Sequence, residues 1–390
     1  MTGAFLALGS VGLAVLATAP LPVRQMSDPE VHADGEAYST TTQVRFLGAA
    51  GFLVRRGRDV VLTAPLYSTP SLFKVLDEER PVILPHLDRI ARFHPDVEDV
   101  QAILVGHAHY DHLMDVPYVW ERAPGAMILG SLTTRNILLG YRGASGGAPG
   151  FPTHVPRVDP DKVVALDDPS DAAHFTVDTR SCEGWVPKCE SEHSCPAVPP
   201  QAGGYLPVSP RMRIRALCAK HPPQFLRYHQ APCCVASPRT TPPSAIDHFR
   251  EGNVFVYLVD FLGEDGAPVF RIYYQDVPAD GRVGHVPEDV LAERPVDLAL
   301  LCAGNAGDVT EPEKIVANLK PGAVIVGHWE DFFQPQDRPL RQAPFQNVEK
   351  YYRCLRRELD ALEGGPERPL YLPKPGVLMT FPPPAAGLRR

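Results

Sequence analysis

The sequence carries no excess of basic residues. Its 390 residues include 38 Lys and Arg against 46 Asp and Glu, a formal net charge of -8. A chain with that charge offers the phosphate backbone of DNA or RNA no attractive field, so we expect no nucleic-acid partner. Charged residues make up 22% and hydrophobic residues 44%, close to globular values, which excludes wholesale disorder and allows a sizeable core. This length accommodates two or three domains or one large duplicated domain.

A confident membrane span is also missing. The apolar run Ala4–Ala19 is uncharged, but it is short and interrupted by glycine. It resembles the apolar part of a signal peptide and ends in Ala17-Thr18-Ala19, a small-x-small cleavage pattern, although no Lys or Arg precedes it and Pro20 follows. We predict that residues 1–22 are a signal peptide or a membrane anchor and that the protein is exported; a buried N-terminal helix is the alternative.

Cysteine is abundant, but no two cysteines have the two-residue spacing of a zinc knuckle. Six of the eight lie in a proline-rich middle segment, an even number that favours disulfides in an oxidising compartment over a zinc site. Their pairing stays open. These six are Cys182, Cys189, Cys195, Cys218, Cys233 and Cys234. The other two, Cys302 and Cys354, lie in apolar patterns typical of buried thiols.

Strand-length apolar segments alternate with helical patterns along the chain, which predicts an α/β fold. Residues 43–62 have the pattern of a β-meander, residues 100–105 that of a strand buried on both faces, and residues 112–122 that of a helix. Proline, 43 residues in the whole chain, is densest in a segment from about 140 to 245, which we predict to be an insertion around one strand at 212–217. A β-hairpin (253–274) and further strand and helix patterns follow, without a repeated sequence motif.

The most informative string, Gly106-His107-Ala108-His109-Tyr110-Asp111-His112, directly follows the buried strand. Three imidazoles and a carboxylate within six residues are ligands that Zn²⁺, Fe and Mn prefer. A polar surface loop is the less favoured interpretation.

The string resembles the H-x-H-x-D-H motif of the metallo-β-lactamase superfamily. That family needs three later ligands that follow strands, and the chain offers His221, Asp276 and His328 in that order. The resemblance extends over residues 43–382 and implies a four-layer αββα sandwich over residues 37–385, with the Cys/Pro-rich insertion inside it.

The resemblance also implies a dinuclear centre. His107, His109 and His221 would hold one divalent ion, Asp111, His112 and His328 the second, and Asp276 would bridge the two. A hydroxide shared by the two ions would be the nucleophile. Zn²⁺ is the expected metal, with Fe or Mn as alternatives.

Several rival residues are set aside. His193 and His229 follow no strand, and we interpret Asp260 as a turn or surface residue. The remaining histidines, His94 among them, are expected at the surface or as capping residues. Many family members have Asp where this chain has Ala64; Asp115 is a possible replacement, although we favour a solvent-facing position for it.

Within the superfamily, the H-x-H-Y-D-H-L string and the later HWEDFF string resemble the branch of N-acyl-phosphatidylethanolamine phospholipase D and ascorbate-6-phosphate lactonase. This implies a hydrolase for a phosphodiester or a lactone or ester, with a small-molecule or lipid-like substrate. The N-terminal apolar run separately suggests a position near a membrane. Asp111, Tyr110 and Lys220 are the candidate catalytic residues, and Trp329 is a candidate wall of the cleft or a core residue. A catalytically inactive binding module with the same fold is the alternative.

Overall fold

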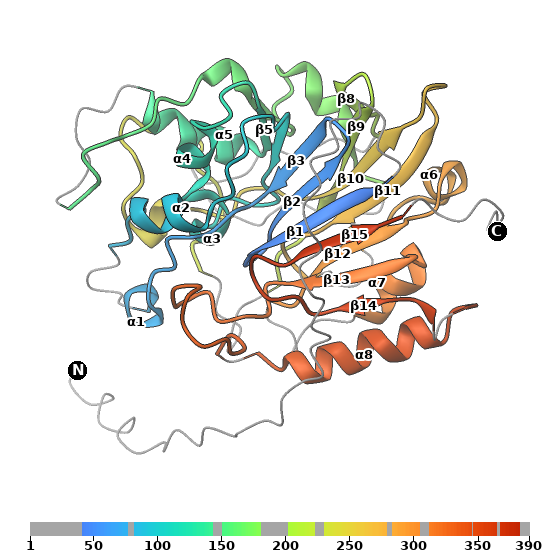
Figure 1. Ribbon diagram of the computed structural model, residues 1–390. Coiled ribbons are helices and arrows are strands. Elements are labelled where there is room, and N and C mark those ends of the chain that lie inside the picture. Colours follow the sequence, from blue (N-terminus) through green and yellow to red (C-terminus); the bar gives the residue numbers. More distant parts are fainter. Residues whose placement is uncertain are drawn as a thin grey trace, which may run out of the picture.

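Two β-sheets form the centre of the molecule (Figure 1). The structure is a computed structural model that describes residues 41–76, 82–142, 150–180, 202–222, 230–278, 283–304, 312–344, 346–364 and 367–382. The N-terminal apolar run, which we predict to be a signal peptide or anchor, lies outside these residues. Within them no helix combines the length and apolar character needed to cross a membrane.

The first sheet contains seven strands. An antiparallel meander of three strands continues into parallel strands, because each later strand follows a crossover connection. In spatial order they are β15 (Leu378–Phe381), β1 (Thr42–Gly48), β2 (Gly51–Arg56), β3 (Asp59–Thr63), β4 (Ala102–Leu104), β5 (Met127–Gly130) and β6 (Val163–Ala165).

The second sheet contains eight strands, again partly antiparallel and partly parallel. In spatial order they are β14 (Leu370–Tyr371), β13 (Ala323–Gly327), β12 (Leu298–Cys302), β11 (Pro268–Tyr274), β10 (Val254–Leu262), β9 (Met212–Ala219) and β7 (Val177–Asp178), with β8 (Leu206–Ser209) beside β9. The glycine-rich turn at 263–266 joins β10 to β11, as the sequence predicts.

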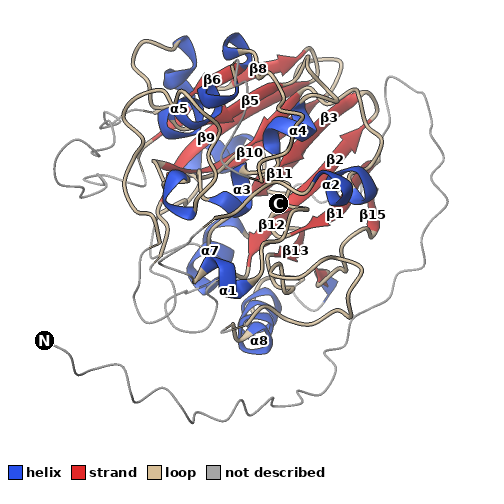
Figure 2. Ribbon diagram, turned by 90° about the vertical axis from the view of Figure 1, so that its left-hand side faces the viewer, coloured by secondary structure: helices blue, strands red, loops and turns tan. Residues whose placement is uncertain are grey.

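Helices cover the outer face of each sheet, and Figure 2 looks from one helical side onto the strands. Beside the first sheet lie α1 (Leu72–Val75), α2 (Leu87–Phe93), α3 (Tyr110–Leu113), α4 (Val116–Trp120) and α5 (Leu132–Leu138). Beside the second sheet lie α6 (Glu288–Glu293), α7 (Pro312–Leu319) and α8 (Val348–Asp360). Short 3-10 turns at Leu139–Tyr141, Pro160–Lys162, Ala172–Thr176 and Ile246–His248 complete the described helical elements.

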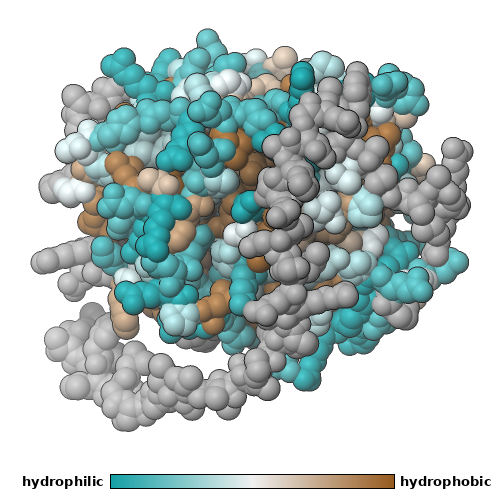
Figure 3. All heavy atoms as spheres, viewed as in Figure 1, coloured by the Kyte–Doolittle hydropathy of each residue, from teal (hydrophilic) through white to brown (hydrophobic). Residues whose placement is uncertain are grey.

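Alternating side chains explain the layers. On β3, Val61 belongs to the core cluster shared with the second sheet, whereas Val60 and Leu62 belong to the cluster under α2–α5. The predicted four-layer α/β sandwich is therefore confirmed. On the face shown in Figure 3, hydrophilic residues predominate and hydrophobic ones gather in small groups.

The segment 140–245 contributes strands to the edges of both sheets. It contains β6 of the first sheet and β7, β8 and β9 of the second. Part of the segment, including Cys182, Cys189 and Cys195, lies outside the described residues, so its disulfide network stays a prediction. Cys302 and Cys354 are free thiols; Cys302 is buried and Cys354 is partly so.

Candidate metal centre

The loop after β4 delivers four side chains to one place. β4 ends at Leu104, and α3 begins at Tyr110 after a short turn that contains His107 and His109. Asp111 and His112 lie in the helical turn itself. All three imidazoles of this loop are buried.

Three later segments converge on the same place. His221 follows β9, Asp276 follows β11 and His328 follows β13, each within two residues of the strand end. All three are buried. Strand ends are where open α/β sheets build their sites, so the fold explains why residues far apart in sequence meet.

All seven side chains form three overlapping groups, named here the seven-residue cluster. In each group, one ligand atom per residue lies within 4.8 Å of the others. The groups are His107, His109 and His221; His107, His112 and Asp276; and Asp111, His112 and His328.

The distances within the cluster are short. The ring centroids of His107 lie 4.7 Å from His109 and 4.9 Å from His221. Asp111 Oδ2 lies 3.3 Å from His112 Nε2 and 3.2 Å from His328 Nε2. Such packing of imidazoles around carboxylates matches the ligand types and spacing of a transition-metal centre.

Asp276 lies between His107, a member of the first group, and His112, a member of the third. Its Oδ1 is 3.1 Å from His107 Nδ1, and its Oδ2 is 3.8 Å from His112 Nδ1. The backbone N–H groups of Gly106 and His107 donate to Oδ2 at 2.8 and 3.2 Å. A Cβ at Gly106 would lie 2.5 Å from Oδ2 and closer still to Cγ and Oδ1, so only glycine permits this approach.

The imidazoles of His107, His109 and His221 are uncharged near pH 7. Burial, with the neighbouring imidazoles, lowers the pKa of His109 and that of His221 to about 3 and the pKa of His107 well below its usual value. A metal ion needs deprotonated ligands, so these imidazoles are already in the binding form.

Ring nitrogens in the cluster are available to a ligand. Among the described residues, four of them are buried without a hydrogen-bond partner, namely His107 Nε2, His109 Nε2, His112 Nδ1 and His328 Nδ1. His221 Nδ1 lies 2.6 Å from the carbonyl oxygen of Pro222, which leaves its Nε2 for another partner. Buried orphaned nitrogens are unfavourable unless something binds them, so the residues fit a metal centre.

The structure separates the other sequence candidates. Tyr110 is buried in the apolar cluster under α2–α5. Trp329 is also buried, and its indole donates to the Pro373 carbonyl, so it is a core residue. Lys220 is exposed beside His221.

Two interpretations of single residues were wrong, and the burial of a third residue was not predicted. Asp115 is not solvent-facing: it is fully buried and accepts hydrogen bonds from the backbone of Tyr67 and Ser68, so it holds the loop after β3. Asp260 is not a turn or surface residue but a buried strand residue paired with Arg271. His94 is the C-cap residue of α2, one of the two positions expected for it, but its ring is buried against the Tyr67 hydroxyl, 3.0 Å away.

Sequence reasoning missed two buried carboxylates close to the cluster. Glu330 lies two residues after His328, and Glu251 accepts through its backbone carbonyl from Ala108 N–H. Burial raises the pKa of Glu251 to about 8, against a lowering influence of Lys220. Only the HWEDFF string and the position before β10 signal these residues, and neither pattern indicates burial.

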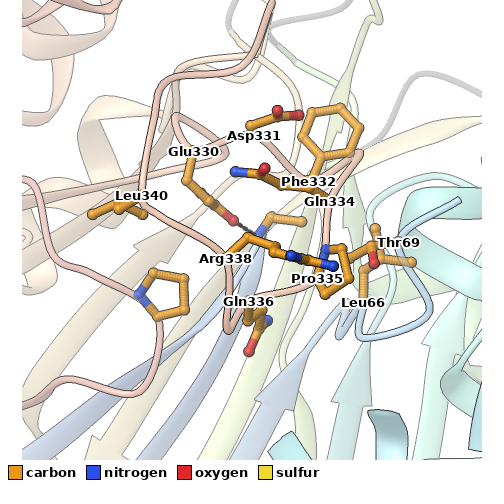
Figure 4. A pocket seen from close by; sticks show the side chains of 12 residues that line it. Leu66, Thr69, Glu330, Asp331, Phe332, Gln334, Pro335, Gln336, Arg338 and Leu340 are labelled. Atoms are coloured by element: carbon orange, nitrogen blue, oxygen red, sulfur yellow. Dashed lines mark hydrogen bonds between the residues drawn. The ribbon is translucent and has the colours of Figure 1, made fainter. Parts of the chain in front are cut away.

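A pocket lies beside the loop that follows His328 (Figure 4). It holds about 340 Å³ of space, part of it open to solvent, between the loop after β3 and the loop after β13. Its wall includes Leu66, Glu330, Phe332 and Arg338. None of the seven cluster residues lines the pocket, but the ring centroid of Phe332, which does, lies 4.5 Å from that of His328.

No protein-family model matches the chain, and no curated protein matches it either. The solved structures to which the chain is similar include metallo-β-lactamase-fold proteins and metal-dependent hydrolases.

Particular neighbours show how distant the likeness is. Igni18, a metallo hydrolase from Ignicoccus hospitalis, shares 13% identity over 87% of this chain and 98% of its own, with a TM-score of 0.43. The metallo-β-lactamase-fold protein YhfI from Bacillus subtilis shares 12% identity over 87% of this chain and 99% of its own, with a TM-score of 0.41. Human tRNase Z, short form, shares 11% identity over 88% of this chain and 99% of its own, with a TM-score of 0.41. Function is therefore inferred from the side chains of the seven-residue cluster.

Proposed function

We propose that the protein is a hydrolase that uses two divalent metal ions. The proposed metal is Zn²⁺, with Fe or Mn as alternatives. One observation carries the proposal: seven ligand-type side chains from four strand ends meet in three overlapping groups. When bound, the two cations would activate water and stabilise the negative charge that develops on the substrate.

Each part of the cluster has a role in this proposal. His107, His109 and His221 offer one site, and Asp111, His112 and His328 offer the second. Asp276 faces both sites, because it lies against His107 and His112 at once. A carboxylate in that position reduces the repulsion between two cations.

We propose a phosphodiester or a lactone or ester as the substrate. The sequence resemblance to the branch of N-acyl-phosphatidylethanolamine phospholipase D and ascorbate-6-phosphate lactonase supports this range. The pocket beside His328 combines the guanidinium of Arg338 with apolar Leu66 and Phe332, so it suits a small-molecule or lipid-like ligand with a polar group. Export and a position near a membrane remain part of the proposal and rest on the N-terminal apolar run alone.

The first experiment measures metal by mass spectrometry in the purified protein. We expect about two metal ions per chain. Fewer than one ion per chain would contradict the dinuclear proposal.

The second experiment measures hydrolysis of bis(p-nitrophenyl) phosphate, an acyl-homoserine lactone and a phosphatidylethanolamine. We expect turnover of at least one substrate that a chelator abolishes and that His109→Ala and Asp276→Ala also abolish. Cleavage of the lactone alone would reject the phosphodiester. A protein with both metal ions that is inert toward all three would favour the inactive binding module.

A further inference from the structure

The turn between β1 and β2 contacts the loop that carries His328. Three hydrogen bonds join them: His328 N–H donates to the Ala49 carbonyl at 2.6 Å, Ala49 N–H donates to the Glu330 carboxylate, and Gln336 Nε2 donates to the Leu47 carbonyl at 2.5 Å. The turn belongs to the first sheet and the loop follows the second. These bonds therefore set the position of one candidate ligand relative to the other half of the molecule.

Both sides of this contact have unusual backbone angles. Ala49 has φ 48° and His328 has φ 57°, left-handed values that cost a residue with a side chain free energy. Such angles persist only where the surroundings impose them. The bonds between the turn and the loop supply that constraint.

The neighbouring glycine leaves no spare room. A Cβ on Gly48 would lie 2.5 Å from Gln336 Nε2 and 3.2 Å from Glu330 Oε1. The contact is thus closely packed as well as hydrogen bonded, so a displacement of either side chain is transmitted to the turn.

Glu330 is an unusual residue for this position. It is only 5% exposed, and a buried carboxylate is unfavourable unless it forms an interaction that compensates. It belongs to none of the three groups of the seven-residue cluster, so it is not a candidate ligand. Its Oε1 accepts the Ala49 N–H, a bond drawn as a dashed line in Figure 4, whereas its Oε2 has no hydrogen-bond partner among the described residues.

We propose that Glu330, with Gln336, is a positioning residue for His328. By fixing the turn at Ala49, it sets the backbone of His328 and so keeps the imidazole next to Asp111, whose Oδ2 is 3.2 Å from His328 Nε2. The inference rests on the proposed dinuclear centre. It assigns Glu330 to the second metal ion, because His107, His109 and His221 lie outside this contact.

The test compares two substitutions that both fill the space of the side chain. Glu330→Met cannot accept the Ala49 N–H, whereas Glu330→Gln keeps an oxygen acceptor. After dialysis against zinc buffered at a fixed free concentration, we expect about two ions per chain in the wild type and in Glu330→Gln and about one in Glu330→Met. The exposed Glu264, changed to Ala, is the matched control and is expected to keep two.

Affinity is the second measurement. Competition with a chromophoric chelator is expected to show that Glu330→Met weakens the second zinc ion about 10-fold to 100-fold and leaves the first unchanged. Gln336→Ala, at a half-buried position where less packing is lost, is expected to weaken the second ion by a smaller factor. This variant keeps the test valid if Glu330→Met does not fold.

The outcomes separate the two proposals. A wild type that binds fewer than two ions contradicts the dinuclear centre itself. A wild type with two ions, together with unchanged second-ion affinity in Glu330→Met or, where that variant does not fold, in Gln336→Ala, overturns the positioning role and leaves the centre intact. Equal losses in Glu330→Gln and Glu330→Met also overturn it, because the hydrogen-bond acceptor would then be irrelevant.

Discussion

Gly106 allows Asp276 to lie close to the loop of histidines, because it has no side chain. Its backbone N–H donates to Asp276 Oδ2, and no Cβ fits at its position. We predict that Gly106→Ala displaces the carboxylate that faces both candidate metal sites. The affinity for zinc then falls at least about 10-fold, since outer contacts to ligands have that effect. Metal analysis after dialysis measures it.

Gly125→Ala is the control for this prediction, because a Cβ there meets nothing within 4 Å. It is expected to bind zinc as the wild type does. Unchanged metal content in Gly106→Ala would mean that Asp276 can move without consequence, and the geometry at Gly106 would then have no bearing on binding.

His94 gives stability a dependence on pH. Burial lowers its pKa to about 4, so between pH 6.5 and 4 the unfolded chain binds a proton there that the folded chain does not. Stability from this group is therefore complete above pH 6.5 and declines as the pH falls, by about 3 kcal/mol in all. Urea unfolding of the metal-free protein at pH 7 and pH 4.5 measures the decline.

His94→Gln keeps a side chain that can bond to the Tyr67 hydroxyl but cannot take up a proton in this range. We expect a smaller loss of stability on acidification in this variant than in the wild type. Equal losses in the two proteins would show that His94 does not contribute.

Single residues also mark what the sequence can predict. The position of His221, Asp276 and His328 just after strands identified them, because strand ends meet at one edge of a fold. The same reasoning misplaced Asp115 and Asp260 and did not predict the burial of His94. Their burial depends on Ser68, Arg271 and Tyr67, which come from other segments, and no local pattern records such partners.

Among the elements, the second sheet carries a buried ion pair on its outer side. Arg271 of β11 is fully buried and binds Asp260 of β10 at 2.6 and 2.8 Å, and it also donates to the Tyr205 hydroxyl. Arg213 of β9 lies 3.0 Å from the same carboxylate. The pair thus ties three adjacent strands together beside α6.

Breaking this pair is predicted to be strongly destabilising. Arg271→Met leaves Asp260 with Arg213 alone, and breaking a buried ion pair by removing one partner costs about 3–5 kcal/mol. The measurement is urea unfolding at constant pH. The double variant Arg271→Met with Asp260→Leu removes both charges and is expected to regain part of the loss.

The exposed pair of Arg353 and Glu349 on α8 provides the comparison. Arg353→Ala is expected to change the free energy of unfolding by less than about 0.5 kcal/mol. A similar small change in Arg271→Met would refute a structural role for the buried pair.

Helix boundaries show where sequence patterns stop being informative. The pattern at 112–122 predicts one helix, but the chain forms α3 and then α4. Pro117 has no N–H to donate to the turn before it, and Asp115 turns inward to the loop after β3. The β-meander predicted at 43–62 agrees closely with β1 to β3, because the three apolar segments are of strand length and glycines separate them.

At the scale of the whole molecule, the seven-residue cluster joins parts that are far apart in the chain. Residues 107–112 follow the first sheet, whereas His221, Asp276 and His328 follow strands of the second. Bound metal ions would therefore link the two sheets at one edge. The same edge gathers buried imidazoles, four of whose ring nitrogens have no hydrogen-bond partner among the described residues.

Metal removal is accordingly predicted to destabilise the entire fold. Ions that bind the folded chain and not the unfolded chain stabilise it by about 4 kcal/mol at a free concentration 1,000 times the Kd, which corresponds to roughly 10 °C in Tm. We expect a chelator to lower Tm by that order and zinc to restore it. His109→Ala and Asp111→Ala, one from each candidate site, are each expected to shrink the zinc-dependent rise. A wild-type Tm that is indifferent to chelator and zinc would contradict the linkage, because ions bound at the junction of both sheets cannot leave without removing contacts from each.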